Sequence, residues 1–220
     1  MATASQVQVW IDQLSGAYAG AVYDVLRELD IPDCTLPKEI RALLPEARLI
    51  GPAFTVSGER VTLSAHETLL NWTGFLSKAP AGAVVVCQPN DHELAHMGEL
   101  SAETLLKRGV RGYLVDGGSR DTAYVRRIGF PVFCRYQTPA DIVGRWIPTA
   151  FGEPVQIGEV TIHEGDLVFA DLDGGLVIPR ERTAEVARRV CEVVNSENKV
   201  RTAILSGADP QQAYLAHGLF

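Results

Sequence analysis

The middle of the chain alternates strand patterns with helix patterns, and this alternation constrains the fold more than any other feature. Residues 83–87 form a run rich in β-branched side chains, and further apolar runs follow at 112–116 and 131–134. Helical patterns near residues 99–108 and 121–128 separate the three runs. Because a β-α-β-α-β order favours parallel strands with right-handed crossovers, we expect a parallel sheet that is buried on both faces.

The flanking segments predict helices at both ends of the chain and short strands after residue 148. Helical periodicity over 7–29, interrupted at Ser15-Gly16, indicates an N-terminal helical segment 1–30, and a C-terminal helix is expected over about 180–196. The remaining predicted elements are strands at 48–56, 155–157, 159–162, 166–170 and 176–178 and a helix at 66–76. We therefore expect a single α/β domain over 1–220, with a parallel βαβαβ core and a β-rich C-terminal half.

The composition is that of a folded, acidic protein. Of the 220 residues, 46% are hydrophobic and 21% are charged, which is enough apolar material for a full core. The formal net charge of −7 argues against nucleic acid as a partner, although a local arginine and a metal can still hold a small anion. A signal-peptide pattern and a membrane-length apolar run are both missing, so we expect a cytoplasmic protein without membrane contact. The four scattered cysteines predict neither disulfides nor a zinc site.

Acidic and basic residues cluster just after the first two strands of the expected core. Gly98 and Glu99 follow the first of these strands, and Arg120 and Asp121 follow the second. Ligands of open parallel sheets bind beyond the carboxyl ends of the strands, and adjacent strands lie about 4.8 Å apart. We therefore expect both loops to converge on one site. Taken alone, Asp121 has a simpler interpretation as the N-cap of the helix expected at 121–128.

This set of residues suits a hard cation beside a small oxo acid. Carboxylates without paired soft ligands favour Mg²⁺ or Mn²⁺. The free N–H groups of Leu100 and Ser101, at a helix start, can receive a substrate carboxylate. A cation chelated by a 2-oxo acid would act as a Lewis acid and stabilise an enolate, with Arg120 supplying further positive charge. Such a site supports both retro-aldol cleavage and decarboxylation of a β-keto acid.

The segments that carry a family resemblance surround these loops. They are 48–53 (RLIGPA), 97–100 (MGEL), 115–121 (VDGGSRD), 129–133 (GFPVF), 165–171 (GDLVFAD) and 175–179 (GLVIP). Over roughly residues 15–195 the chain resembles the family shared by class II 4-hydroxy-4-methyl-2-oxoglutarate/4-carboxy-4-hydroxy-2-oxoadipate aldolases and the regulator of ribonuclease activity A. The central motif is specific, because the glycines, the Arg-Asp pair and their separation all match together.

The resemblance implies a swivelling-type β/α fold and a divalent-metal-dependent lyase. Such an enzyme cleaves a 4-hydroxy-4-carboxy-2-oxo acid to pyruvate and decarboxylates oxaloacetate as a side activity. The resemblance also implies that Asp121 ligates the metal directly, that Glu99 holds metal-bound waters and that Arg120 contacts the keto acid. The backbone of Gly98, Glu99, Leu100 and Ser101 would bind the substrate carboxylate.

The same resemblance implies homotrimers or homohexamers with active sites at subunit interfaces. An acidic residue from a neighbouring subunit belongs to the site in this family, and Glu192 and Glu197 are the candidates here. Members without the Arg-Asp pair are not expected to be aldolases, so a non-catalytic oligomer that binds a protein partner is the alternative. This chain keeps Arg120 and Asp121, which favours catalysis.

A competing motif, HELAH at 92–96, matches the zinc-peptidase signature H-E-x-x-H. A peptidase would need both histidines on one continuous helix and a third ligand farther along. Here a proline-containing turn precedes the motif and a glycine follows almost at once, so the helix would be barely two turns long. We expect His92 or His96 to line the same pocket as Asp121, or to cap a turn, in preference to binding zinc.

Overall fold

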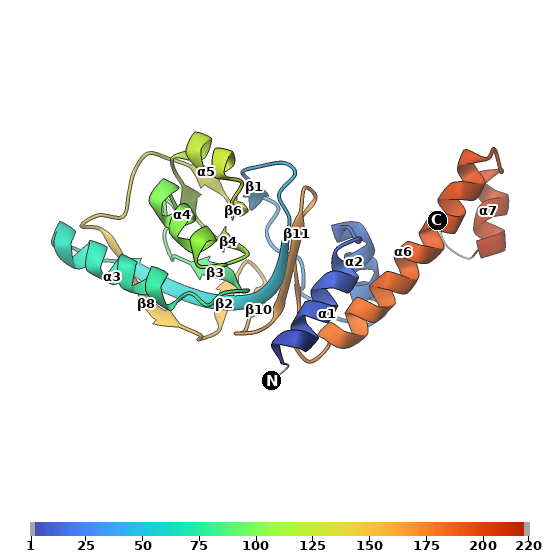
Figure 1. The fold of residues 1–220 in the computed structure, drawn as a ribbon, viewed down its shortest axis with the longest axis horizontal. Coiled ribbons are helices and arrows are strands. Elements are labelled where there is room, and N and C mark those ends of the chain that lie inside the picture. The colour runs from blue at the N-terminus through green and yellow to red at the C-terminus, as the bar shows by residue number, and fades with distance from the viewer. Residues whose placement is uncertain (1–2, 218–220) are drawn as a thin grey trace.

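A mixed sheet runs through the protein in the computed structural model, which describes residues 3–217. Its strands are hydrogen-bonded in the order β1-β6-β4-β3-β2-β11-β12, and β8 pairs with β2. The strands are β1 (Arg41–Ala42), β2 (Leu49–Arg60), β3 (Val84–Gln88), β4 (Gly112–Val115), β6 (Val132–Cys134), β8 (Trp146–Phe151), β11 (Leu167–Asp171) and β12 (Gly174–Ile178). Figure 1 shows the long β2 curving between the two halves of the molecule.

The predicted parallel core is confirmed. β2, β3, β4 and β6 are parallel neighbours, with Val85 opposite Tyr113 and Leu114 opposite Phe133. The prediction that the run at 83–87 is buried on both faces also holds, because its side chains alternate between two hydrophobic clusters. Val85 joins the cluster under the helices of one face, and Val84 joins the cluster of the opposite face.

Three helices cover one face of the parallel strands (Figure 1). They are α3 (Ala65–Lys78), α4 (Glu99–Lys107) and α5 (Thr122–Ile128). α3 begins at a capping box, in which Ser64 and Glu67 bond each other's backbone N–H groups. The β9–β10 hairpin (Val155–Ile157 and Val160–Ile162) contributes to the hydrophobic cluster on the opposite face. The helices on the first face fix where the loops after β3 and β4 end.

The terminal helices pack together on the outer strands of the sheet. α1 (Ala4–Leu14) and α2 (Ala19–Glu28) are separated where the interruption was predicted, and they share a core with β11, β12 and the start of α6 (Thr183–Leu205). The prediction that the last helix ends near residue 196 was wrong. α6 continues to Leu205, because the sequence has neither glycine nor proline between Pro179 and Gly207.

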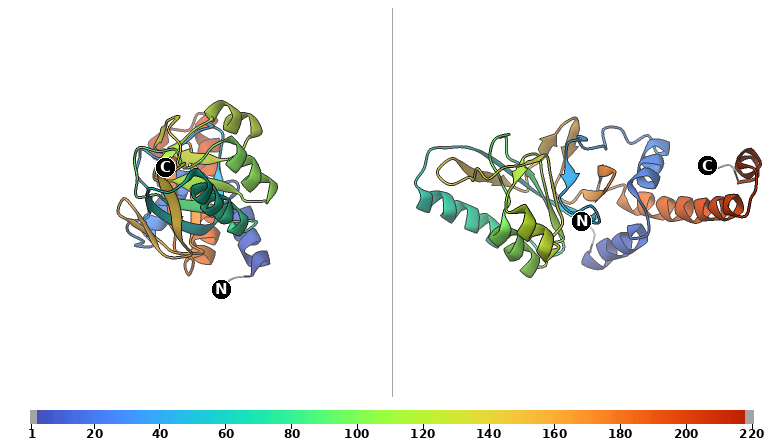
Figure 2. Two further views of the ribbon diagram at one scale, coloured as in Figure 1. Left: turned by 90° about the vertical axis from the view of Figure 1, so that its left-hand side faces the viewer. Right: turned by 90° about the horizontal axis from the view of Figure 1, so that it is seen from above.

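The outer part of α6 leaves the body of the molecule and carries α7 (Pro210–His217) at its end (Figures 1 and 2). This helix was not predicted. Within residues 3–217, every helix is too short or too polar to cross a bilayer.

We expect Gly112→Ala to destabilise the fold, because the packing around β4 leaves no room for a side chain. A Cβ atom at Gly112 would lie 2.7 Å from the backbone oxygen of Pro131 and 2.2 Å from Leu49 Cδ2. Overpacking of this kind costs about 1–3 kcal/mol. The matched control is Gly74→Ala in α3, where nothing lies within 4 Å of the new atom. Urea unfolding should show a lower midpoint for Gly112→Ala and an unchanged or higher midpoint for Gly74→Ala; equal midpoints would contradict this account of the packing.

Candidate functional site

Backbone hydrogen bonds join the loop after β3 to the loop after β4. Ala95 and Gly118 form a parallel bridge, and the His96 N–H donates to the Gly118 oxygen at 2.8 Å. The Arg120 N–H donates to the Met97 oxygen at 2.8 Å. The predicted convergence of the two loops is therefore present, and main-chain bonds hold it in place.

The loop after β6 joins the same edge of the sheet. Two short strands that were not predicted, β5 (Gly118–Ser119) and β7 (Tyr136–Gln137), pair in parallel and carry the chain past the core strands. The Thr138 N–H then donates to the Ser119 oxygen at 3.1 Å. Three loops from the carboxyl ends of parallel strands thus form one surface, where this class of sheet places its ligands.

Asp121 reaches across to the loop of Gly98 and Glu99. Its Oδ2 accepts the Glu99 N–H at 3.1 Å. A Cβ atom on residue 98 would lie 2.7 Å from that oxygen, so the close approach requires glycine. Asp121 occupies the N-cap position of α5, yet its side chain makes no capping hydrogen bond there. The Asp121 carboxylate therefore accepts a hydrogen bond from the neighbouring loop and does not cap α5, the helix that it precedes.

The backbone of Asp121 adopts a left-handed conformation, with φ of +53°. Aspartate tolerates this region better than most residues, but the conformation still carries a cost and is enriched at functional sites. Here it turns the Asp121 carboxylate away from α5 and toward the start of α4.

Arg120 lies beside the same carboxylate. Its Nε is 3.5 Å from Asp121 Oδ2, and its Nη1 is 3.2 Å from Asp141 Oδ2. A cavity of about 300 Å³ opens next to this pair. It is lined by Arg120, Asp121, Thr122, Gln137, Thr138 and Pro139. The predicted arginine and aspartate therefore share an open pocket.

The start of α4 presents the other predicted groups. Gly98 is its N-cap and makes no side-chain capping bond, so the first N–H groups of the helix depend on other partners. Asp121 takes the N–H of Glu99, while Ser101 uses its hydroxyl to accept the Trp72 indole N–H at 2.9 Å. Leu100 is 76% exposed. Within residues 3–217, the N–H groups of Leu100 and Ser101 have no hydrogen-bond acceptor, and their role in binding a carboxylate stays a prediction.

The donor set fits a hard divalent cation that is held by few protein ligands. Asp121 Oδ1 and the Glu99 carboxylate take part in no hydrogen bond or ion pair within residues 3–217. In the same range, no group of three or more His, Cys, Asp or Glu side chains is placed to surround an ion. Mg²⁺ commonly keeps several waters and binds one or two carboxylates together with its substrate. Asp121 and Glu99 can provide that minimum, with water and substrate completing the shell.

The HELAH segment does not form the helix that a zinc peptidase needs. Residues 92–96 are irregular apart from the bridge at Ala95, His92 is exposed and His96 is 1% exposed. The His96 ring packs edge-on against Trp146 at 4.9 Å between centroids. Neither histidine is among the residues that line the cavity beside Asp121. Through its backbone, His96 contributes to the site by holding Gly118.

Burial determines the ionisation of His96. Desolvation lowers the pKa of His96 from 6.5 to about 4, although Asp91 Oδ2 lies 3.3 Å from its Nε2. Burial also opposes the charge of Asp91, yet the N–H groups of Leu94 and Glu93 and the Arg60 guanidinium hold the pKa of that carboxyl below its usual value. His96 is therefore neutral at pH 7 beside a charged aspartate.

Asp141 and Arg145 were missed by the sequence reasoning. Both follow β6, the last of the parallel core strands, and Asp141 contacts Arg120 directly. The rule that ligands lie beyond the carboxyl ends of parallel strands applies to this strand as well. That rule was the available signal, but residues 135–145 contain no glycine-rich motif that would have drawn attention to them.

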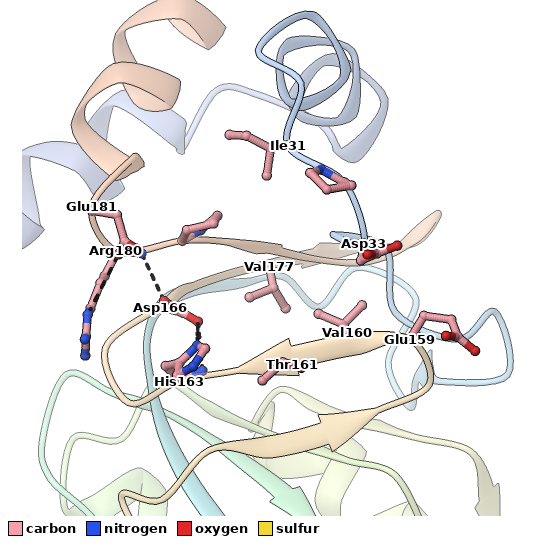
Figure 3. Close-up of a pocket in the computed structure, with 12 residues that line it drawn as sticks. Ile31, Asp33, Glu159, Val160, Thr161, His163, Asp166, Val177, Arg180 and Glu181 are labelled. Carbon is pink, nitrogen blue, oxygen red and sulfur yellow. Dashed lines mark hydrogen bonds and ion pairs between the residues drawn. The ribbon is translucent and has the colours of Figure 1, made fainter.

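A second cavity, of about 350 Å³, lies away from this site between β10, β12 and the loop before β1 (Figure 3). Asp166 is buried there and accepts the backbone N–H groups of His163 at 2.8 Å and Arg180 at 3.0 Å. Asp33 and Glu159 lie at the opposite end (Figure 3). Asp166 therefore already has hydrogen-bond partners, and it ties the turn at His163 to the start of α6. None of the predicted site residues lines the cavity.

The two acids named as candidates for a neighbouring subunit have partners within their own chain. Glu192 pairs with Arg188 and Arg189, and Glu197 accepts a hydrogen bond from the Tyr18 hydroxyl. Both residues lie on α6, away from the loops around Asp121 (Figure 1).

Comparisons with known proteins agree on one family. A family model described as RraA-like, Aldolase/RraA, matches residues 19–177. Protein DlpA of Legionella pneumophila is 30% identical over 207 residues, which is 92% of this chain but 33% of that protein, so the chain spans about a third of DlpA. A protein of Halalkalibacterium halodurans named "Putative 4-hydroxy-4-methyl-2-oxoglutarate aldolase" is 27% identical over 180 residues. The alignment covers 82% of this chain and 83% of that protein.

Among solved structures, RraAS2 of Streptomyces coelicolor aligns with a TM-score of 0.75 and 27% identity, covering 87% of this chain and 95% of its own. It is described as an unusual member of the RNase ES inhibitor RraA protein family. The expected mixed α/β fold is confirmed by this likeness.

The low pKa of His96 predicts a specific loss of stability in mild acid. Between pH 6.5 and about 4 the unfolded chain binds a proton that the folded chain excludes, so the free energy of unfolding falls as pH falls through this window. The substitution His96→Gln removes the titrating imidazole. Urea unfolding at pH 7 and pH 5 should show a loss about 1–2 kcal/mol larger for the wild type than for His96→Gln. Equal losses in both proteins would mean that His96 is not buried in its neutral form.

Proposed function

The chain belongs to the RraA-like (Aldolase/RraA) family, and on that premise we propose that it is a divalent-metal-dependent aldolase. Its substrate would be a 2-oxo acid with a hydroxyl and a carboxylate at C4, and one product would be pyruvate. Oxaloacetate decarboxylation would be a side activity. We further propose that the whole chain acts as one RraA-like aldolase domain.

One contact carries the proposal: the Glu99 N–H bonded to Asp121 Oδ2 at 3.1 Å. It brings the Asp121 carboxylate to the start of α4, beside the Arg120 guanidinium, and Arg120 and Asp121 line the cavity there. These groups suit a 2-oxo acid, because N–H groups can receive its C1 carboxylate, and a cation held by Asp121 together with Arg120 would stabilise the C2 oxygen as it gains negative charge.

Bound Mg²⁺ or Mn²⁺ would supply Lewis-acid polarisation of the 2-oxo group. Asp121 would hold the cation directly through Oδ1, and Glu99 would orient its waters. Arg120 forms ion pairs with both Asp121 and Asp141, which hold its guanidinium beside the pocket. There it can stabilise negative charge on the oxygen at C2. The N–H groups of Leu100 and Ser101 would bind the C1 carboxylate, assisted by the helix dipole.

The proposed reaction is a retro-aldol cleavage. The C4 hydroxyl loses its proton, the bond between C3 and C4 breaks, and its electron pair moves toward the carbonyl at C2. The enolate of pyruvate then takes a proton at C3. Oxaloacetate would release carbon dioxide by the same electron flow, because its C3–C4 bond breaks to give the same enolate. The Arg120 side chain faces the developing charge in both cases.

We also propose a homotrimer or homohexamer with sites at subunit interfaces. The α6–α7 arm extends beyond the body, and Leu205 on it is 82% exposed (Figure 2). Apolar side chains on an extended helix are typical of surfaces that another chain covers. Glu192 or Glu197 would complete a neighbour's site only after leaving its present intrachain partners.

The same arm favours a second candidate function, that of a regulator which binds a protein partner without catalysis. Arg120, Asp121 and the open cavity beside them have no evident role in such a regulator. The two functions differ in one respect that is easily measured, which is metal-dependent turnover.

We expect purified protein to release pyruvate from oxaloacetate when Mg²⁺ or Mn²⁺ is added. The spontaneous metal-catalysed reaction is subtracted with a protein-free blank. A chelator should abolish the protein-dependent rate, and added metal should restore it. Turnover that survives chelation would argue against the metal, and a rate equal to the blank under every condition would favour the regulator.

Asp121→Asn and Arg120→Gln should each lower the pyruvate-forming rate at least about 100-fold, because each removes a charge aimed at the reacting group. Asp173→Asn is the matched control, since Asp173 lies in the β11–β12 turn, outside the proposed site. Near-normal rates in the two site variants, with all proteins folded by circular dichroism, would contradict the assignment.

A further inference from the structure

Arg120 lies between two aspartates that belong to different loops. Its Nη1 donates a hydrogen bond to Asp141 Oδ2 at 3.2 Å, and its Nε is 3.5 Å from Asp121 Oδ2. The first distance is within the range of N–H···O hydrogen bonds, and the second is longer than that range. The three side chains are between 36% and 38% exposed, so burial favours neither ion pair over the other. Arg120 is therefore bonded more closely to Asp141 than to its neighbour in the sequence.

The remaining contacts of Asp141 fix it to the loop after β7. Its Oδ1 accepts the Val143 N–H at 3.2 Å and lies 3.2 Å from Arg145 Nη2, which also donates to the Asp141 carbonyl oxygen at 2.5 Å. The carbonyl oxygen of Ala140, the preceding residue, accepts the Ala95 N–H at 2.7 Å. These contacts leave the second carboxylate oxygen, Oδ2, to accept a hydrogen bond from another loop.

The stem of the Arg120 side chain lies over Gly98. A Cβ atom on residue 98 would be 3.2 Å from Arg120 Cγ and 3.3 Å from its Nε. The stem is therefore held on one side, whereas the guanidinium at its end can turn toward either aspartate. A long, partly exposed arginine has considerable rotamer freedom, so contacts at its end are needed to select one orientation.

The two carboxylate oxygens of Asp121 have different surroundings. Oδ2 accepts the Glu99 N–H and faces Arg120, whereas Oδ1 takes part in no hydrogen bond or ion pair within residues 3–217. Arginine and carboxylate groups favour a bidentate pair with two parallel N–H···O bonds. Such a pair between Arg120 and Asp121 would occupy Oδ1, the atom that the proposed function assigns to the cation. In the described part of the chain, Arg120 Nη2 makes no hydrogen bond or ion pair, so the bidentate pair is not formed.

We propose that Asp141 keeps Asp121 available to a divalent cation by competing with it for Arg120. The inference rests on the proposed function, since it takes Asp121 Oδ1 to be the ligand of the cation. Asp141 is a positioning residue, because it acts on the cation site through the arginine. Without its charge, Arg120 closes on Asp121 as a bidentate pair, and a cation binds only after that pair has opened.

This competition has a signature in the metal dependence of the rate. Exposed ion pairs are weak, so a high metal concentration opens the pair between Arg120 and Asp121. We therefore expect Asp141→Asn to raise the metal concentration that gives half-maximal pyruvate formation. The rate at saturating metal should stay within about threefold of wild type. Asp121→Asn, which removes the proposed ligand itself, should stay slow at every metal concentration.

The affinity for Mn²⁺, measured by electron paramagnetic resonance of the free ion, tests the inference without turnover. It is compared in wild type, Asp141→Asn, Arg120→Gln and the double variant, so that the effect of Asp141 is seen with and without the arginine. Asp141→Ser is a second variant, because a serine hydroxyl can still accept the Val143 N–H and support the loop. Circular dichroism checks that each variant is folded.

Asp24→Asn is the matched control for the loss of an exposed aspartate beside an arginine. Asp24 pairs with Arg27 at 3.0 Å on α2, outside the loops of the proposed site. This substitution should leave the Mn²⁺ affinity unchanged.

We expect Asp141→Asn and Asp141→Ser to weaken Mn²⁺ binding about 3- to 10-fold, and by less than about twofold when Arg120→Gln is already present. Equal weakening with and without Arg120 would overturn the inference, because Asp141 would then act on the cation without the arginine. Unchanged affinity in the single variants would overturn it as well. A wild-type affinity equal to that of Asp121→Asn would overturn both the inference and the proposed metal ligand. The expected pattern of affinities from a protein that releases no pyruvate would refute the aldolase and leave the role of Asp141 standing.

Discussion

The candidate site depends on the hydrogen bond between the Glu99 N–H and Asp121 Oδ2. This bond is possible only because the loops after β3 and β4 are already joined by main-chain bonds at Ala95–Gly118 and Met97–Arg120. Residue 98 must also lack a side chain, since a Cβ atom there would meet the aspartate oxygen. The direction of the Asp121 carboxylate is therefore set by the ends of the parallel strands, by the main-chain bonds between the two loops and by Gly98. The charge of Arg120 is then held beside it by Asp141.

The HELAH segment (residues 92–96) buries its last three residues in the interior, and it also positions the loop that carries Arg120. His96 has a buried, neutral ring, and its backbone holds Gly118. Gly117 packs so closely on that ring that a Cβ atom would lie 2.9 Å from His96 Nδ1. The glycines before Arg120 are therefore required for packing against this segment. The stability of the region and the position of the arginine depend on the same contacts.

The sequence allowed the parallel core and the two main loops to be predicted, because β-branched runs and loop glycines have local causes. Strand β8 was not predicted: Pro148 interrupts its pattern, and the strand forms through pairing with β2 at a bulge beside Gly58. The extra length of α6 was missed because its outer half has few buried apolar positions to reveal it. Asp141 was missed because its contact with Arg120 joins two loops, a contact that spacing along the chain does not reveal.

Exchange of the pyruvate methyl protons with solvent tests most directly whether Asp121 and Arg120 stabilise an enolate. In D₂O with Mg²⁺, proton NMR should show the methyl signal of pyruvate decaying in the presence of the wild-type protein. The decay should return to the protein-free rate with Asp121→Asn or after chelation. Exchange no faster than the protein-free rate, from folded wild-type protein with metal and saturating pyruvate, would contradict the account.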